Sequence, residues 1–209
     1  LAKETGAVWI IDEISAGFRM NTGGLHLKLN IEPDIAVFSK AMGNGYPIAA
    51  IIGKENVMQA AQSTFISSTM WSERIGFVAA LETIKKHKKN NAGVHLNFIG
   101  EKVQEGWKDA AYKSGILLDV GGIPPMSYFN FKHEKSSSMK SLFIQLMLAE
   151  GFLASNIFDA MYAHQLLHVN DYIKSVTKSF KTISNCIEND TLEKIMKGSP
   201  SSTGFRRLT

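Results

Sequence analysis

The sequence predicts an α/β fold, with part of a larger sheet-containing domain followed by a small α+β domain. The first observation is that three continuous apolar runs lie early in the chain, over 7–12, 34–40 and 48–53. Short apolar runs rich in β-branched residues are typical of strands buried on both faces, as in parallel sheets. The second observation is that helical periodicity then alternates with two further apolar strands, which is typical of an α+β unit.

A polar break near residues 85–93 separates these two patterns. We therefore expect residues 1–88 to form the partial large domain and residues 89–198 to form the small domain. The last residues, 199–209, are polar and contain Gly and Pro, so we expect a flexible tail there.

Each of the three early strands has recognisable limits. The run "AVWIID" ends on Asp12, and the second run is opened by Pro33 and Asp34. The third is bounded by Pro47 and Gly53. A polar loop that contains glycines joins the first two strands.

Helical spacing predicts two consecutive helices after these strands. The first covers 72–88, and the second ends at Gly115 as a C-terminal glycine usually ends a helix. Their apolar stripes are formed by Phe77, Val78, Leu81 and Ile84 in the first helix and by Ile99, Val103, Trp107 and Ala111 in the second.

The remaining elements follow from apolar runs and turn residues. Two strands within 116–131 are joined by a Gly-Gly-Ile-Pro-Pro turn, and the loop "HEKSSS" follows. A helix over 139–150 ends at Gly151. Asn170 is expected to be the N-cap of the last helix.

Composition limits the classes of function. The chain has 209 residues, a net charge of +4 and a pI near 9.1, and its charges are spread out apart from "KKHKK" at 85–89. This short run is expected to be a solvated helix end, and no basic face with interleaved aromatics indicates a nucleic-acid partner. No apolar run is long enough to span a membrane.

The chain has a single cysteine, Cys186, which excludes an internal disulfide and a cysteine-based metal cage. We expect Cys186 to be a packing residue. A single cysteine also fits a reducing compartment, and we expect a cytoplasmic protein.

Four features could carry chemistry: Asp12 and Glu13 after one strand, Lys40 after another, the glycine turn 43–45, and the hydroxyl cluster in 65–71. The strand "WIIDE" alone has the shape of a Walker B strand. That alternative, a nucleotide hydrolase, requires a phosphate loop G-x-x-x-x-G-K-[ST], which the sequence lacks.

Asp12 and Lys40 are more informative together, because both follow strands whose carboxyl ends lie at the ligand-binding edge of an open α/β sheet. A lysine there is partly removed from water, which favours the nucleophilic neutral amine. An amine and a carboxylate suit pyridoxal phosphate: the amine forms a Schiff base with the aldehyde, and the carboxylate pairs with the pyridine nitrogen. Hydroxyls such as Ser67, Ser68 and Thr69 suit its phosphate.

Three motifs carry a resemblance to a known family. They are "IIDEISAGFR", "PDIAVFSKAMGNGYPIAAIIG" and "FISSTMWSERIGFVAALETI", in that order. The chain resembles the class III aminotransferases of pyridoxal-phosphate (PLP) fold type I, and is most similar to the glutamate-1-semialdehyde aminomutase branch. The likeness is strong over about residues 1–90 and extends more loosely through 143–176. The resemblance thus implies the C-terminal part of a PLP fold type I transferase.

The resemblance also implies roles for single residues. Asp12 would pair with the pyridine nitrogen. Lys40 would form the aldimine and then act as the base that moves the substrate proton. Thr69 would reach the cofactor phosphate in the partner subunit of a homodimer, and Ser39 would line the cofactor site. No metal is implied.

Other matching residues are expected to be structural. Glu13, Gly17, Phe18 and Arg19 fit loop architecture rather than chemistry, and His164 is expected to be structural as well.

Two departures from the family bear on function. The region "FLASNIFDAMYA" lacks the arginine that the ω-aminotransferase branch uses for a carboxylate, which favours the aminomutase-like branch. Family members are also longer, and by resemblance this chain is their C-terminal half. We therefore expect the 209 residues alone to bind PLP weakly or not at all and to transfer no amino group.

The substrates implied are a small-molecule amino donor and a carbonyl acceptor, and the sequence does not decide between transaminase and mutase. A non-catalytic remnant of the same fold is the alternative that remains open.

Overall fold

The computed structural model describes residues 1–200, in two compact units. The first unit covers Leu1–Asn97 and the second begins at Phe98. Helix α5 (Ala92–Lys113) starts in the first unit and continues into the second. The part of the expected tail from 201 to 209 lies outside the described residues.

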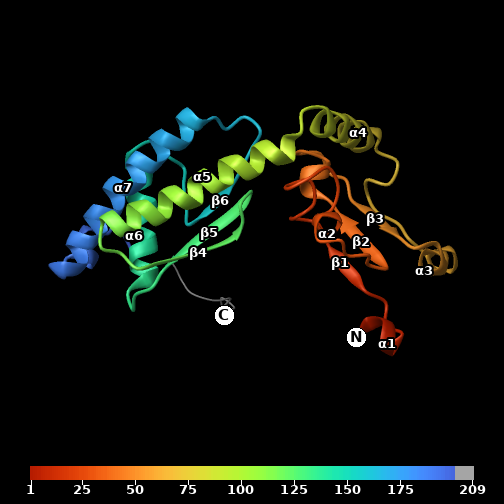
Figure 1. Cartoon of the computed structure of the whole chain (residues 1–209), viewed down its shortest axis with the longest axis horizontal. Coiled ribbons are helices and arrows are strands. Elements are labelled where there is room, and N and C mark those ends of the chain that lie inside the picture. The colour runs from red at the N-terminus through yellow and green to blue at the C-terminus, as the bar shows by residue number, and fades with distance from the viewer. Residues whose placement is uncertain (201–209) are drawn as a thin grey trace. The chain divides into compact units, whose positions relative to one another are not determined.

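The first unit contains a three-stranded sheet of order β1-β2-β3, drawn in red to orange in Figure 1. Strand β1 (Ile10–Asp12) runs parallel to β2 (Ile35–Phe38), and β3 (Ala50–Gly53) runs antiparallel to β2. The expected parallel arrangement is therefore wrong for β3. The reason is the short connection over 39–49, because a parallel crossover needs a dozen or more residues.

This sheet is covered on one face. Ala36 and Phe38 of β2 are buried in a core with Phe18, Met42 and Ala80. On the other face, Ile10 of β1 and Ile51 of β3 are 57% and 58% exposed. The strands were expected to be buried on both faces. This expectation is wrong for the described residues, because no helix or strand that they form covers the second face of the sheet.

The other elements of the first unit are mostly single turns that hydrophobic periodicity cannot detect. The exception is α4 (Arg74–Lys89), which confirms the helix expected over 72–88. The single turns are α1 (Ala2–Thr5), α2 (Leu25–Lys28), η1 (Lys40–Met42), α3 (Glu55–Met58) and η2 (Gln59–Ser63).

The second unit has an antiparallel sheet and four helices (Figure 1). The predicted hairpin is confirmed as β4 (Leu118–Ile123) paired with β5 (Met126–Phe131). The third strand, β6 (Ile157–Asp159), pairs with β5 and was not predicted. The helices that follow α5 are α6 (Ser136–Ala149), α7 (Leu166–Glu188) and α8 (Leu192–Ile195).

The core of the second unit is built around Phe129 of β5. Its ring centroid lies 4.9 Å from that of Trp107 on α5 and 5.2 Å from that of Phe143 on α6. The ring of Phe180 on α7 lies 5.6 Å away. Three helices therefore pack on one face of this sheet, and Cys186 of α7 is buried as expected.

Two predicted helix starts are wrong. Helix α7 begins at Leu166 rather than after Asn170, and the ring Nδ1 of His168 accepts a hydrogen bond from the Gln165 N–H at 3.1 Å. This bond satisfies a backbone donor at the earlier start. Helix α6 begins at Ser136, so the last part of the predicted loop is helical.

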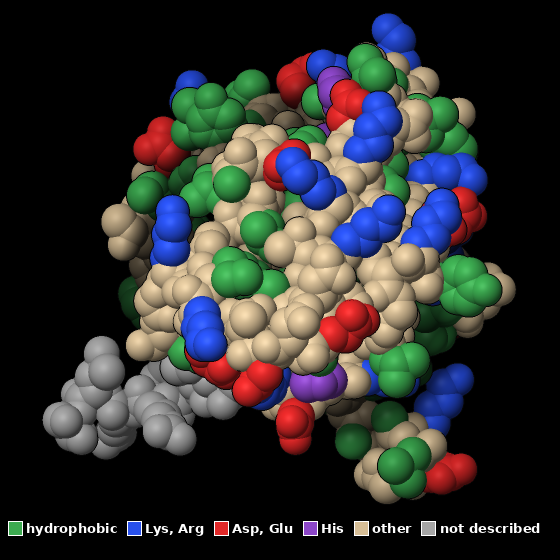
Figure 2. Space-filling model, turned by 90° about the vertical axis from the view of Figure 1, so that its left-hand side faces the viewer, with side chains coloured by type: hydrophobic (Ala, Val, Ile, Leu, Met, Phe, Trp, Pro, Cys, Tyr) green, Lys and Arg blue, Asp and Glu red, His purple; other side chains and the backbone are tan. Residues whose placement is uncertain are grey.

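Charged side chains are dispersed on the surface. Figure 2 shows basic side chains, Lys or Arg, interspersed with acidic and hydrophobic side chains on the face it presents. Over residues 1–200, the search for bilayer-spanning helices found none with the required length and apolar character. The same residues contain no group of three or more His, Cys, Asp or Glu arranged to hold a metal ion.

Candidate functional site

Asp12 is the last residue of β1 and lies beside Val37 in the parallel ladder. Its Oδ1 accepts a hydrogen bond from the Ile14 N–H at 2.8 Å. The side chain is exposed. One carboxylate oxygen is therefore fixed by the turn after the strand.

Lys40 follows β2 and begins the turn η1. Its Nζ donates a hydrogen bond to Ser15 Oγ, in the turn that follows Asp12. The structure thus places the amine and the carboxylate at the same edge of the sheet, as the parallel strand ends predict. The side chain of Lys40 is exposed, so the expected removal from water is wrong for the described residues.

The backbone at Lys40 is unusual. Its φ is 41°, in the left-handed region that non-glycine residues rarely adopt. Strain of this kind is found at functional sites more often than elsewhere. The Lys40 carbonyl accepts hydrogen bonds from the N–H groups of Gly43 and Asn44 at 3.1 and 3.0 Å, so the glycine segment turns back tightly, as expected.

Ser39 and Thr69 are placed differently from these two. Ser39 Oγ donates to the Ile48 carbonyl at 2.8 Å, which ties β2 to the segment before β3. Thr69 lies in the exposed segment between η2 and α4. Among the described residues, no hydrogen bond joins Thr69 to Asp12 or Lys40, and the cofactor roles of Ser39 and Thr69 stay predictions.

His164 was expected to be structural. Its Nδ1 accepts a hydrogen bond from the Met161 N–H at 3.1 Å, and its ring stacks on Phe158 at 5.2 Å between centroids. Both contacts lie within the second unit and are consistent with that expectation.

The loop after β1 is anchored by a buried pair that the sequence did not reveal. Glu13 is 1% exposed, and its Oε1 accepts hydrogen bonds from the backbone N–H and the ring Nδ1 of His26, at 2.8 and 2.7 Å. Glu13 was expected only to belong to the loop architecture. A single histidine in a polar loop gives no signal for this pairing, because only the tertiary fold brings the two residues together.

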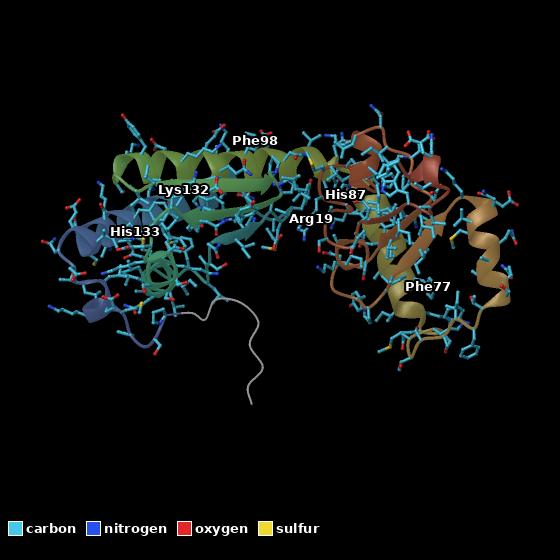
Figure 3. All side chains as sticks on the ribbon, turned by 90° about the horizontal axis from the view of Figure 1, so that it is seen from below. Arg19, Phe77, His87, Phe98, Lys132 and His133 are labelled. Atoms are coloured by element: carbon cyan, nitrogen blue, oxygen red, sulfur yellow. The ribbon has the colours of Figure 1, made fainter. Side chains whose placement is uncertain are left out.

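A second anchor of the same loop comes from α4. His87 is buried and its Nε2 donates to the Phe18 carbonyl at 3.1 Å, while its Nδ1 lies 2.8 Å from Thr22 Oγ1. Burial lowers the pKa of His87, although the bond to the Phe18 carbonyl partly opposes this effect. Within the same loop, the Nε of Arg19 donates to the Ser15 carbonyl at 3.2 Å; Arg19 and His87 are labelled in Figure 3. The loop that carries Ser15 is thus held at its start by the Glu13–His26 pair and further along by His87.

The groups at this edge fit one part of pyridoxal phosphate. A primary amine held over the turn that follows a carboxylate matches the aldehyde and pyridine-nitrogen ends of that cofactor. The hydroxyl groups of 67–69 are exposed and lie apart from this hydrogen-bonded cluster in sequence. The described residues therefore fit the aldehyde of the cofactor, through the Lys40 amine, and its ring nitrogen, through the Asp12 carboxylate.

Residues 1–187 match the family model described as aminotransferase class-III. The chain is 33% identical over 165 residues to the 3-aminobutyryl-CoA aminotransferase of Cloacimonas acidaminovorans, with 78% of this chain and 39% of that protein covered. It is 27% identical over 201 residues to the glutamate-1-semialdehyde 2,1-aminomutase of a Sulfurihydrogenibium species, with 88% of this chain and 47% of that protein covered. The chain thus spans less than half the length of these relatives.

Solved structures show the same fold. The PLP internal aldimine form of the FumI protein of a Sphingopyxis species has a TM-score of 0.82 at 24% identity, covering 90% of this chain and 46% of that one. An omega-transaminase from Sphaerobacter thermophilus has a TM-score of 0.79 at 16% identity, covering 88% and 46%. At these identities the likeness establishes the fold, which is that of part of a fold type I transaminase.

Proposed function

Because the chain belongs to the class-III aminotransferase family, we propose that it carries the lysine and the carboxylate of a pyridoxal-phosphate-dependent aminotransferase or aminomutase. The whole protein would move an amino group between a small-molecule donor and a carbonyl acceptor. Family membership argues against the nucleotide hydrolase that "WIIDE" alone leaves open.

One observation carries the proposal. The bond from Lys40 Nζ to Ser15 Oγ holds the amine over the turn that follows Asp12. The Ile14 N–H in the same turn holds the Asp12 carboxylate. A nucleophilic amine and an anion are thereby directed to one edge of the sheet, where open α/β folds bind ligands.

Each of the two residues would have a distinct task. Pyridoxal phosphate, when bound, supplies an electron sink that stabilises a carbanion next to the substrate amine. The Asp12 carboxylate would accept a charge-assisted hydrogen bond from the protonated pyridine nitrogen and so keep the ring positively charged. Lys40 would hold the cofactor through Nζ and, once released by the substrate amine, carry a proton on the same atom.

Further groups extend the proposal. Ser39 precedes the lysine and would line the site through its backbone, since its hydroxyl is bonded to the Ile48 carbonyl. Thr69 would serve the cofactor phosphate of a partner subunit, which makes a homodimer part of the proposal. The division into a large domain over 1–88 and a small domain over 89–198, and a cytoplasmic location, stay predictions.

We propose an aminomutase-like enzyme as the finer assignment, and a transaminase as its alternative. The missing arginine in 152–163 supports the first, and so does a likeness to the Sulfurihydrogenibium aminomutase that covers 88% of this chain. The higher identity to the Cloacimonas aminotransferase, 33%, supports the second.

The test addresses the lysine itself. The full chain is mixed with excess pyridoxal phosphate and reduced with borohydride, and the modified peptides are mapped by mass spectrometry. We expect Lys40 to be the most strongly modified lysine, because Ser15 holds its amine at the turn after Asp12, whose carboxylate would pair with the pyridine nitrogen of the bound aldehyde. Lys40→Ala should remove that adduct and leave the circular dichroism spectrum unchanged.

Lys54→Ala is the matched control. Lys54 is also exposed, and its Nζ is bonded to Asp34 Oδ1 at 2.8 Å, outside the proposed site. This variant should retain the Lys40 adduct. An even distribution of adducts over the lysines of the chain would contradict the proposal.

A further inference from the structure

Glu13 lies next to Asp12 but faces the interior. Its backbone N–H donates to the Val37 carbonyl at 2.8 Å, which continues the β1–β2 ladder one residue beyond the strand. Successive side chains of an extended segment point to opposite faces. The exposed Asp12 carboxylate and the buried Glu13 carboxylate are consequently mounted on the same rigid piece of backbone.

The Glu13 carboxylate is unevenly satisfied. Its Oε1 accepts two hydrogen bonds from His26, whereas its buried Oε2 has no partner among the described residues. A buried polar atom without a partner is costly. A buried pair of polar side chains is by itself weak evidence of a contribution to stability.

The surrounding backbone is shaped to admit the pair. Gly24 lies so close that a Cβ there would be 2.3 Å from the His26 ring and 2.8 Å from Glu13 Oε1. The φ of Gly24 is −80°, an ordinary value for any residue, so the space and not the backbone conformation requires glycine. The pair is therefore a closely fitted contact between the end of β1 and the start of α2.

The pair is joined to the backbone that holds Asp12. Glu13 stands between Asp12 and Ile14, and the Ile14 N–H fixes Asp12 Oδ1 at 2.8 Å. The two bonds from His26 restrain the Glu13 side chain, which is attached to the backbone directly before that N–H.

We propose that Glu13 and His26 are positioning residues that fix the orientation of the Asp12 carboxylate toward the ring nitrogen of the cofactor. This inference rests on the proposed function for its purpose. Its structural part, the control of the Asp12–Ile14 contact by His26, is independent of any cofactor.

The test uses the full chain labelled with ¹⁵N, without cofactor. An amide that donates to a carboxylate changes its chemical shift when that carboxylate is protonated. In the wild type, the Ile14 amide should shift as Asp12 is titrated with acid, and Asp12→Asn should abolish this shift. His26→Leu removes the ring bond to Glu13, keeps the backbone one, and should reduce the shift at least severalfold. His26→Gln, whose side chain can still donate to Glu13, should restore most of it.

The remaining outcomes also decide the proposal. A folded His26→Leu variant with the full Ile14 shift would overturn it. If His26→Leu does not fold, His26→Asn replaces it. The asparagine amide is polar but too short to make the bond that the His26 ring makes to Glu13 Oε1, so this variant should also reduce the Ile14 shift. His133→Leu, at an exposed histidine, is the control and should leave the shift unchanged.

Trapping at Lys40 distinguishes this inference from the proposed function. A wild-type chain that shows no preference for Lys40 but retains the His26-dependent Ile14 shift would contradict the proposed function alone. Selective trapping at Lys40 in both the wild type and His26→Leu, with an unchanged Ile14 shift, would contradict the positioning role alone.

Discussion

Lys40 donates a hydrogen bond from Nζ to the hydroxyl of Ser15, which lies 25 residues earlier in the turn after β1. Over residues 1–200, this exposed hydrogen bond is the one that ties the amine to the turn after Asp12. A hydrogen bond of this kind contributes about 1 kcal/mol, which corresponds to roughly a fivefold preference for one side-chain position.

Ser15→Ala should therefore reduce the selectivity of Lys40 for pyridoxal phosphate about fivefold, with little change in the free energy of unfolding. Adduct mapping after borohydride reduction and urea unfolding measure the two quantities. Ser63→Ala removes a different exposed hydroxyl, which bonds the Ala60 carbonyl, and should change neither. Undiminished selectivity in Ser15→Ala would show that the bond does not position the amine.

The sequence was sufficient to predict the three strands of the first unit and the sheet edge at which Asp12 and Lys40 both lie. Apolar runs define strands, and the carboxyl ends of parallel neighbours lie together whatever covers the sheet. The helix α4 and the hairpin β4–β5 were predictable for the same reason, since both depend on local periodicity.

The errors concern properties that local sequence does not determine. The direction of β3 depends on the path of the connection 39–49, and the exposure of Lys40 depends on which elements surround the sheet edge. The contact between Glu13 and His26 joins residues 13 positions apart through a loop without periodicity. Only the folded chain reveals such contacts.

Gly24→Ala should destabilise the first unit by about 1–3 kcal/mol, the usual cost of overpacking a closely fitted site. The cause is the contact of the new Cβ with the His26 ring and Glu13 Oε1. Urea unfolding gives the free energy, and the ring signals of His26 in NMR spectra report the local displacement.

Gly115→Ala provides a contrast for this variant. A Cβ at Gly115 meets no atom within 4 Å, but its φ of +66° is unfavourable for alanine. We expect a cost of about 1–2 kcal/mol from the backbone alone, with no change at His26. An unshifted His26 ring in Gly24→Ala would mean that the pair is not closely fitted.

The stability of the first unit should depend on the protonation of His87. Burial lowers the pKa of His87 in the folded chain from its ordinary value of 6.5, so the unfolded chain binds a proton more readily. The contribution of neutral His87 to the free energy of unfolding is therefore fully present above pH 6.5. It is lost as the pH falls through the lowered pKa of His87 in the folded chain.

His87→Gln tests this dependence, because the amide can still donate to the Phe18 carbonyl and accept from Thr22 but does not titrate. Urea unfolding above and below pH 6.5 should give a smaller difference for this variant than for the wild type. His133→Gln, at an exposed histidine of the second unit, should retain the full difference. If His87→Gln and the wild type show the same difference in unfolding free energy between the two pH values, the pH dependence comes from other groups.

The uncovered face of the first sheet should make the chain self-associate. Ile10, Ile35, Val37 and Ile51 share this face by register, and Ile10 and Ile51 are more than half exposed. Within residues 1–200, the flanking strands β1 and β3 also form the two edges of this sheet. Contiguous exposed apolar surface beside open strand edges favours intermolecular contact.

Ile51→Lys should weaken this association, because a charge on this apolar face cannot be buried without a large cost. Sedimentation velocity over a range of chain concentrations should show a lower average mass for this variant than for the wild type. Leu117→Lys introduces the same charge at an exposed apolar residue of the second unit, and it should associate like the wild type. If both variants shift equally, the effect comes from net charge and not from the face of the sheet, and a wild type that is monomeric throughout would refute the expectation directly.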